Sequence, residues 1–261
     1  MSRIAEAFQR IRAKGRGGLI TYVTAGDPTL QRSGDVLRAL DRAGADLLEV
    51  GVPFSDPLAD GPVIQRASER ALSAGATLDG VLRMVADVRT SVSAPIVLFS
   101  YANPIHRMGF ATFASRAADA GVDGVLTLDL PVEESDPLRS VLAAAGVDVI
   151  FLLSPTTTLE RMRRAGELGT GFLYAISRMG VTGARDTIAT GVSALVQRIR
   201  SVSDLPVAVG FGLSRPEHVQ AVGAVADAAV VGSALVSVIA ETGDTPELVP
   251  RVEEYVRWLR G

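Results

Sequence analysis

The stretch RAGADLLEV, residues 42–50, joins the end of a helical pattern to an apolar run across the single glycine Gly44. The same arrangement returns in DAGVDGVLTL, residues 119–128, and in AAGVDVIFLL, residues 144–153. A glycine that ends a helix in the left-handed conformation lets the chain turn directly into a strand. The repeated arrangement therefore predicts helices and strands that alternate with short connections.

Short apolar runs rich in Val, Ile and Leu recur along the whole chain. They are Leu19–Val23, Asp46–Val50, Pro95–Ser100, Asp123–Leu128, Asp148–Leu153, Gly171–Ile176, Pro206–Gly210 and Asp227–Val231. These runs are uniformly apolar instead of alternating, as is typical of parallel strands that are covered on both faces. They predict the eight strands of a parallel sheet.

Amphipathic segments separate the apolar runs and predict the helices of the fold. They are Leu30–Ala43, Val63–Leu72, Leu78–Val88, Phe110–Ala120, Glu133–Ala145, Leu159–Leu168, Val192–Val202, Pro216–Val222 and Ala234–Ala240, with Leu248–Leu259 after the last. Strand and helix repeated eight times favour a closed (β/α)8 TIM barrel, with residues 1–261 as one domain. Ile4, Phe8 and Ile11 at helical spacing add an extra N-terminal helix. An open Rossmann-like sheet is the alternative.

The composition of the chain excludes several classes of partner and of active site. The 261 residues carry a formal net charge of −3, and the 26 lysines and arginines are spread along the chain, which disfavours nucleic acid and anionic membrane as partners. No cysteine is present, which excludes disulfides, a thiolate nucleophile and a cysteine metal site. The N-terminus lacks a secretory apolar segment, and no apolar run reaches the roughly 20 residues of a membrane span. The prediction is a cytoplasmic enzyme.

The basic side chains also limit the chemistry. Lys14 is the only lysine, and it lies in the N-terminal segment, so Schiff-base catalysis inside a barrel is disfavoured. His106 and His218 are the only histidines, and their spacing does not suit a shared zinc site. Catalysis is therefore expected to depend on carboxylates, hydroxyls and backbone dipoles, without a metal.

Glu49 is the sharpest candidate for a catalytic residue, because it interrupts an apolar run one residue before that run ends. In a barrel of this class the active site gathers at the C-terminal ends of the strands. A buried, unpaired carboxylate is costly or has a raised pKa. Glu49 is thus either a general acid/base or a structural carboxylate bonded to backbone amides, and the residues alone leave both possibilities open.

The loop that follows Glu49, VPFSDPLADGP at residues 52–62, holds three prolines and one glycine. Such a loop is stiff and suits the placement of carboxylates at the barrel mouth. Asp60 would face the same substrate as Glu49 and accept a hydrogen bond from it, whereas Asp56 is more typical of a turn residue. Tyr101, Asp129 and Tyr174 also follow or end predicted strands, and each has either a structural or an active-site role.

Glycines gather after the last three predicted strands, in Ser177–Gly183, Gly210–Ser214 and Gly232–Ser233. Backbone amides at glycine turns and helix N-termini bind anions, and barrels often hold phosphate after strands seven and eight. The spacing from Ser214 to Glu217 further predicts a capping box. Together these segments predict a phosphate site.

Six motifs span nearly the whole chain. They are LLEVGVPFSDPLADGPVIQ at 47–65, SYANPI at 100–105, LDLPVEES at 128–135, ISRMGVTGAR at 176–185, VGFGLS at 209–214 and VVGSAL at 230–235. On these motifs the chain resembles the α subunit of tryptophan synthase. The resemblance implies retro-aldol cleavage of indole-3-glycerol phosphate to indole and glyceraldehyde 3-phosphate, with no metal or organic cofactor in this subunit.

The resemblance also implies roles for individual residues. Glu49 matches the general acid/base, Asp60 the carboxylate that accepts the indole N–H, and Tyr174 a supporting active-site tyrosine. The phosphate pocket is matched by Gly183, Gly212, Gly232 and Ser233. Thr182 matches the loop that closes over substrate, and Tyr22, Ile64, Leu126 and Phe211 match the indole pocket. Tyr22 stands where relatives often carry Phe, and Ser100 where an apolar residue is common.

A partner is implied as well: a pyridoxal-phosphate β subunit that receives indole in an α2β2 assembly. Pro53–Pro57, Ala102–Pro104 and Pro131–Glu134 match the docking face. Two other functions stay open from the sequence. One is a different phosphate-binding barrel enzyme of amino-acid biosynthesis, and the other is a non-catalytic subunit that activates a β-type enzyme.

Overall fold

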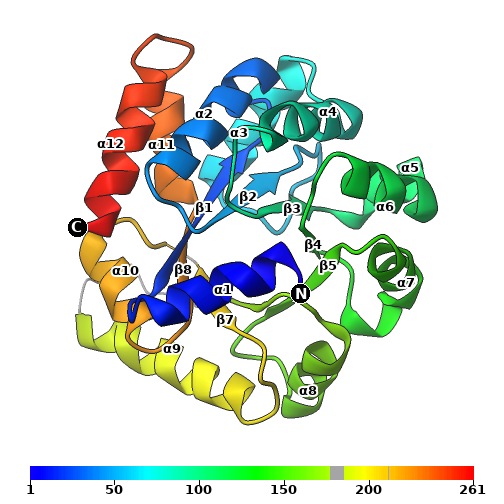
Figure 1. Ribbon diagram of the computed structural model, residues 1–261, viewed down its shortest axis with the longest axis vertical. Helices are drawn as coiled ribbons and strands as arrows, with labels where there is room; N and C mark the ends of the chain where they lie inside the picture. Colours follow the sequence, from blue (N-terminus) through cyan, green and yellow to red (C-terminus); the bar gives the residue numbers. More distant parts are fainter. Residues whose placement is uncertain (177–184, 211) are drawn as a thin grey trace.

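A closed barrel of eight parallel strands, hydrogen-bonded in chain order, forms the centre of the molecule (Figure 1). The computed structural model describes residues 1–176, 185–210 and 212–261. The strands are β1 (Gly18–Thr24), β2 (Leu47–Gly51), β3 (Ile96–Ser100), β4 (Gly124–Thr127), β5 (Asp148–Leu153), β6 (Leu173–Ile176), β7 (Val207–Gly210) and β8 (Ala228–Val231). Pairing of β1 with β8 closes the sheet, so the predicted (β/α)8 barrel is confirmed and the open sheet is excluded.

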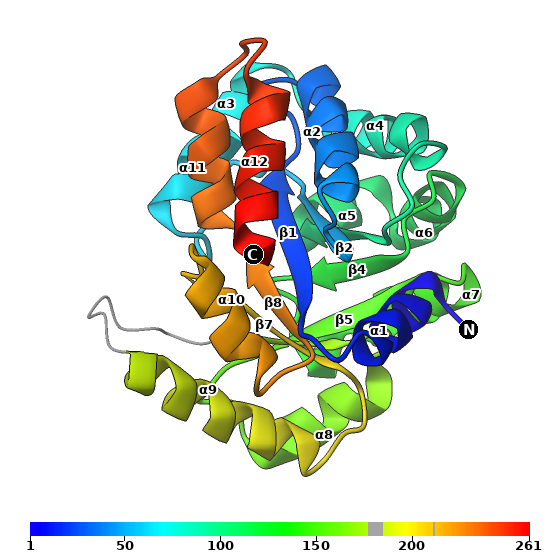
Figure 2. The same ribbon diagram turned by 60° about the vertical axis from the view of Figure 1, so that its left-hand side comes forward.

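Helices surround the barrel in the order that the sequence predicts. They are α1 (Arg3–Ala13), α2 (Leu30–Arg42), α3 (Pro62–Ser73), α4 (Leu78–Arg89), α5 (Ala102–Met108), α6 (Phe110–Asp119), α7 (Asp136–Ala144), α8 (Leu159–Leu168), α9 (Arg185–Arg200), α10 (Pro216–Gly223), α11 (Ser233–Thr242) and α12 (Leu248–Arg260). Figure 2 shows α11 and α12 side by side, next to α2. The glycines that connect helix to strand have positive φ, with 95° at Gly44 and 79° at Gly121, as predicted.

Three helical segments differ from the prediction. The expected helix 133–145 is divided into a 3-10 turn at Val132–Glu134 and helix α7, because Pro137 has no amide N–H to continue a helix that starts earlier. Helix α5 was not predicted; Pro104 lies in its first turn, where a missing N–H is tolerated. Helix α9 begins before Val192, in a stretch whose threonines and glycine are weak helix formers.

Two layers of side chains form the core. The outer layer fills the space between strands and helices. The inner layer fills the barrel itself and includes Ile20, Leu47 and Val97 from the strands. Helix α1 contributes Ile4, Phe8 and Ile11 to this inner layer, and it lies across the end of the barrel where the strands begin (Figure 1). Helix α1 therefore closes that end of the barrel.

A reciprocal pair of hydrogen bonds joins each even-numbered strand to the strand before it. A residue shortly before the even-numbered strand donates its backbone N–H to the backbone carbonyl of a residue at the start of the odd-numbered strand. The side chain of the first residue then accepts a hydrogen bond from the backbone N–H of the second. The pairs are Asp46 with Leu19, Asp123 with Ile96, Thr170 with Val149 and Asp227 with Val207, all at 2.8–2.9 Å. Basic residues of α1 bind the three aspartates, as Lys14–Asp46, Arg3–Asp123 and Arg12–Asp227. The pairs fix strand register at the closed end.

Asp46→Ala is expected to lower the free energy of unfolding by about 2 to 4 kcal/mol. The substitution removes the acceptor of the Leu19 N–H and leaves Lys14 and Arg260 without their common carboxylate. Urea denaturation at neutral pH measures the loss. Asp204→Ala, at an exposed aspartate, is the control and should change stability by less than about 0.5 kcal/mol. Equal effects of the two substitutions would contradict the role of the reciprocal bonds.

Candidate active site

Glu49 points into the barrel, one layer above the closed core. Side chains alternate along a strand, so Glu49 faces the same side as Leu47, which belongs to the inner layer. Glu49 has no exposed surface, and neither carboxyl oxygen has a hydrogen-bond partner among the described residues. Burial without a partner raises the pKa of Glu49 to about 8. Among the described residues, no backbone amide is bonded to Glu49 as the structural alternative requires.

Two tyrosines lie beside Glu49, each with its hydroxyl over a glycine of the next strand. A Cβ atom at Gly51 would lie 2.1 Å from Tyr22 Oη, and one at Gly210 would lie 2.1 Å from Tyr174 Oη. Burial is the main cause that raises the pKa of both tyrosines, and the charge of Glu49 adds to it. Both hydroxyls therefore remain protonated near Glu49.

Gly51 and Gly210 shape the site, although the sequence motifs did not single them out. Any larger residue at these strand ends would push the tyrosine rings out of position. Their signal in the sequence is weak, because a glycine at the end of a strand is usually explained by the turn that follows. Strand register places each tyrosine two residues before the partner of its glycine, and only the folded structure shows that the hydroxyl reaches that glycine.

Asp60 and Glu49 both act on the Tyr22 hydroxyl through their charges. Burial is the main cause that raises the pKa of Tyr22, and the charges of Asp60 and Glu49 raise it further. Tyr101, whose role the sequence left open, donates a hydrogen bond from its hydroxyl to Asp60 Oδ2 at 3.0 Å. Burial raises the pKa of Asp60, and the bond from Tyr101 lowers it. Tyr101 is thus in direct contact with a predicted site residue, a contact that the sequence did not reveal.

The other two loop aspartates have local roles. Asp56 is exposed and accepts a hydrogen bond from the Ser55 hydroxyl at 2.6 Å, in agreement with a turn residue. Asp129 follows β4 and accepts the backbone N–H of Ala102 at 2.6 Å. It therefore fixes the first residue of α5, and its hydrogen bond is not directed at Glu49.

The lining of the predicted indole pocket comes from two clusters of side chains. Tyr22 and Ile64 pack together in one of them, and Leu126 belongs to the inner layer of the barrel with Tyr174. Phe99, which was not predicted, connects the clusters: its ring lies 5.3 Å from that of Tyr22 and 6.2 Å from that of Tyr174. Phe211 and Thr182 lie outside the described residues.

Ser100 lies at the end of β3, next to this aromatic group. It is fully buried, and its hydroxyl donates to the carbonyl of Tyr101 at 2.9 Å. The Ser100 hydroxyl is therefore hydrogen-bonded to the adjacent backbone, and it does not make the pocket more polar.

Glycines line the part of the mouth above β7 and β8. Gly212 has a φ of 73°, a conformation that favours glycine, and it is exposed. Gly232 is the N-cap of α11 and Ser233 its first residue, and no side chain caps this helix. The amides of the first turn are thus available to a ligand. Gly183, the fourth residue predicted for phosphate, lies outside the described residues.

The predicted capping box at Ser214 is wrong. Helix α10 begins at Pro216, and Arg215 is its N-cap, without a side-chain cap. Pro216 occupies the first helical position, which moves the helix start one residue past the position that the spacing requires. The amide of Ser214 donates instead to His218 Nδ1 at 3.2 Å.

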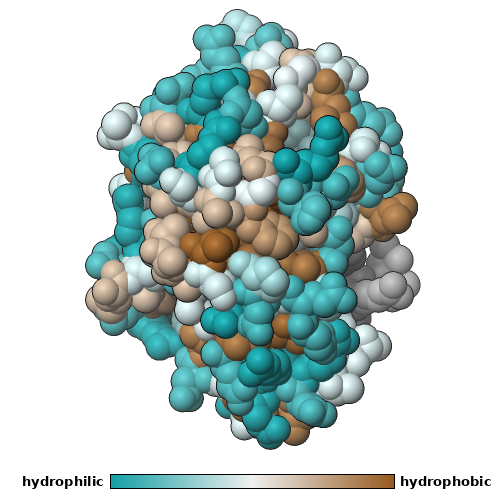
Figure 3. Space-filling view, turned by 90° about the vertical axis from the view of Figure 1, so that its right-hand side faces the viewer, coloured by the Kyte–Doolittle hydropathy of each residue, from teal (hydrophilic) through white to brown (hydrophobic). Residues whose placement is uncertain are grey.

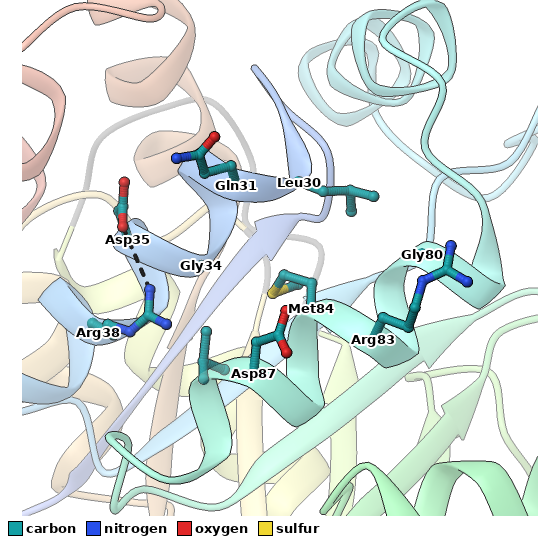
Figure 4. A pocket seen from close by; sticks show the side chains of 10 residues that line it. Leu30, Gln31, Gly34, Asp35, Arg38, Gly80, Arg83, Met84 and Asp87 are labelled. Atoms are coloured by element: carbon teal, nitrogen blue, oxygen red, sulfur yellow. Dashed lines mark hydrogen bonds and ion pairs between the residues drawn. The ribbon is translucent and has the colours of Figure 1, made fainter.

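A groove of about 510 Å³ lies elsewhere, between α2 and α4 (Figure 4). Its lining includes Leu30, Met84 and the ion pair of Asp35 with Arg38, at 3.4 Å. The groove is on the helices outside the barrel, and none of the predicted site residues lines it. Among the described residues no group of three or more His, Asp or Glu side chains is arranged to hold a metal ion.

The family profile described as tryptophan synthase alpha chain matches residues 8–259. The chain belongs to the tryptophan synthase alpha chain family. The tryptophan synthase alpha chain of Solibacter usitatus is 45% identical over 260 residues, which cover 100% of this chain and 97% of that one. That of Nitrosococcus oceani is 48% identical over 262 residues, with the same coverage.

Solved structures of tryptophan synthase share the fold. The alpha subunit from Legionella pneumophila has a TM-score of 0.91 at 36% identity and covers 100% of this chain and 97% of that chain. A chain of the Mycobacterium tuberculosis tryptophan synthase has a TM-score of 0.90 at 38% identity, with coverage of 99% and 96%. Within the part of the chain that is described, no helix has the length and apolar character needed to cross a membrane.

Proposed function

We propose that residues 1–261 form a single-domain lyase that cleaves indole-3-glycerol phosphate to indole and glyceraldehyde 3-phosphate, with Glu49 as general acid/base and Asp60 as the partner of the indole nitrogen. Membership of the tryptophan synthase alpha chain family supports the reaction. The observation that carries the residue assignment is Glu49 itself, a buried carboxyl at the C-terminal end of a barrel strand that has no partner within the described part of the chain.

The pKa of about 8 leaves Glu49 mostly protonated at neutral pH. In the proposed mechanism the protonated Glu49 gives its proton to C3 of the indole ring, and the ring becomes a cation. The resulting carboxylate then takes the proton of the hydroxyl on the adjacent side-chain carbon. The bond between that carbon and C3 breaks, its electron pair returns to the ring, and indole leaves with glyceraldehyde 3-phosphate. One residue therefore gives one proton and recovers one.

Asp60 would stabilise the positive charge on the ring nitrogen, since the hydrogen bond from Tyr101 favours its ionised form. An iminium from lysine is not needed, because the protonated ring holds the electrons. The only lysine supports this view: Lys14 binds Asp46 at the closed end of the barrel, 3.5 Å away. Tyr22, Phe99 and Tyr174 enclose the site in apolar surface and exclude water from it.

The phosphate group is proposed to bind at Gly212, Gly232 and Ser233. Gly232→Asp is expected to raise KM about 10- to 100-fold while kcat changes little. The new carboxylate would lie at the N-terminus of α11 and would repel the phosphate that binds there. A Cβ atom at Gly232 would lie 3.4 Å from Tyr22 Cβ, so the backbone admits a side chain. Steady-state kinetics of indole release give both constants.

The matched control is Gly232→Asn, which has the shape of aspartate without its charge. It should raise KM far less than Gly232→Asp does. If the two substitutions raise KM equally, bulk and not charge is responsible, and an unchanged KM in both would place the anion elsewhere.

The proposed partner is a pyridoxal-phosphate β subunit in an α2β2 assembly; pyridoxal phosphate would belong to that partner alone. The loop with Pro53–Pro57, the start of α5 and the 3-10 turn would form the docking face. Figure 3 shows the side of the molecule that carries α5 and α6, where apolar side chains gather near the middle of a largely hydrophilic surface. Leu58, in the same loop, is 93% exposed, which suits a side chain that a partner covers.

The decisive experiment is to incubate the purified chain alone with indole-3-glycerol phosphate and to measure indole. We expect slow turnover, and faster turnover when a β subunit is added. Turnover only in the presence of the β subunit would favour the non-catalytic activating role. Cleavage of a different phosphorylated substrate, with none of indole-3-glycerol phosphate, would favour another barrel enzyme.

A further inference from the structure

We propose that Tyr101 is a positioning residue that holds Asp60 in place for the reaction and connects it to the exposed crest of the loop at residues 52–61. The proposal rests on the proposed function, because it concerns Asp60, one of the two carboxylates that the proposed reaction uses. It gives a definite role to a residue for which the sequence left a structural and an active-site role open.

The Tyr101 hydroxyl makes two hydrogen bonds to neighbouring residues of the loop. It donates to Asp60 Oδ2 and accepts the backbone N–H of Ala59, each at 3.0 Å. A hydroxyl that donates to one residue and accepts from the next fixes the carboxylate relative to the backbone that carries it. Tyr101 itself is only 5% exposed, so its ring has little freedom to move.

The Tyr101 ring also contacts the beginning of the same loop. It packs on Phe54, with ring centroids 5.0 Å apart and planes inclined by 32°. One side chain therefore holds both ends of the loop, Phe54 at its start and Asp60 at its end. Between them the Gln65 side chain donates to the carbonyl of Pro57 at 3.4 Å, while the next residue, Leu58, is 93% exposed.

The Tyr101 hydroxyl stays protonated, because burial and the charge of Asp60 raise its pKa. Since it accepts the N–H of Ala59, its own proton is left for Asp60. Among the described residues, Tyr22 on β1 also feels the charge of Asp60, while Asp129 acts on Tyr101 from the end of β4. The bond from Tyr101 thus opposes the effect of burial and favours the ionised Asp60.

Tyr101 is anchored from outside the loop as well. It is the N-cap of α5, and the next residue, Ala102, donates its N–H to Asp129 at 2.6 Å. The loop at 52–61, the start of α5 and the end of β4 are therefore connected through adjacent residues. These regions include or adjoin the proposed docking face, so Tyr101 lies between that face and Asp60.

The test is Tyr101→Phe, which keeps the ring on Phe54 and removes only the hydroxyl. We expect kcat to fall about 10- to 100-fold while KM changes less than about threefold. We also expect the acid limb of the kcat profile to move to higher pH, because Asp60 loses the bond that favours its ionised form. Reduced stability alone would not move that limb. A Tyr101→Phe enzyme with the parent kcat and pH profile would overturn the proposal.

A second measurement does not depend on turnover. The carboxyl carbon of Asp60, labelled with ¹³C and assigned by its disappearance in Asp60→Asn, is titrated by NMR in the parent and in Tyr101→Phe. We expect the Asp60 pKa to be higher in the variant, and equal values would overturn the proposal. Tyr255→Phe is the control, since it also removes a hydroxyl that donates a bond, here to the carbonyl of Ser214 at 2.9 Å, and it should leave Asp60 unchanged.

The two measurements separate this proposal from the proposed function. If the parent releases no indole from indole-3-glycerol phosphate, the proposed function fails, and the titration still decides whether Tyr101 controls Asp60. If the parent is active and Tyr101→Phe changes neither the titration nor the kcat profile, the function stands and the positioning role is wrong.

Discussion

Glu49→Gln is expected to abolish indole release, with kcat lowered by at least about 10³-fold. Glutamine keeps the volume of the side chain but cannot give a proton to the ring or take one from the hydroxyl. Single-turnover assays of indole formation measure the loss. Glu69→Gln, an exposed glutamate on α3, is the matched control and should retain parental activity. Activity of Glu49→Gln within tenfold of the parent would contradict the assignment.

The same substitution should stabilise the fold at alkaline pH. The pKa of Glu49 is about 8, above the ordinary value of 4.5, so the folded chain holds the proton more tightly than the unfolded chain does. Stability from this group is fully present below pH 4.5 and is lost as pH rises to 8. Glutamine does not titrate. The free energy of unfolding of Glu49→Gln should therefore exceed that of the parent increasingly between pH 4.5 and 8, by on the order of 4 to 5 kcal/mol at the upper end.

Urea denaturation of both proteins at several pH values measures this difference. A difference between Glu49→Gln and the parent that stays constant from pH 4 to 9 would mean that Glu49 has an ordinary pKa in the fold. The kcat/KM of the parent should fall as pH rises above about 8, since the first step needs the protonated carboxyl.

Asp60→Asn is expected to lower kcat about 10³-fold, with a smaller effect on KM. Asparagine has the size of aspartate and can still accept the hydrogen bond from Tyr101, but it carries no charge to stabilise the ring cation. The pKa of Glu49 arises from burial alone, so the alkaline limb of the pH profile should remain near pH 8 in this variant. A moved alkaline limb would show that the two carboxylates titrate together.

The control is Asp119→Asn, at an exposed aspartate at the end of α6, which should leave kcat unchanged. A loss in Asp60→Asn of less than tenfold would show that the ring nitrogen finds its stabilisation elsewhere. Equal losses in the two variants would point to a general effect of charge on the enzyme.

Much of the barrel follows from local patterns in the chain. Each apolar run and each glycine after a helix is a property of neighbouring residues, and all eight strands lie within one or two residues of their predicted bounds. The errors are local as well: Pro137 divides one helix, and Pro216 moves the start of another past Ser214. Composition alone restricts the chemistry, because the chain has no cysteine and a single lysine.

The sequence by itself determined the barrel, an extra N-terminal helix, and Glu49 as an acidic side chain within an apolar strand. Only the tertiary structure decided that Glu49 has no partner among the described residues, and that Tyr101 bonds an aspartate 41 positions away. It also decided which glycine accommodates which tyrosine. The physical reason is that periodicity and turn chemistry act between near neighbours, whereas these contacts depend on strand register and on closure of the whole barrel.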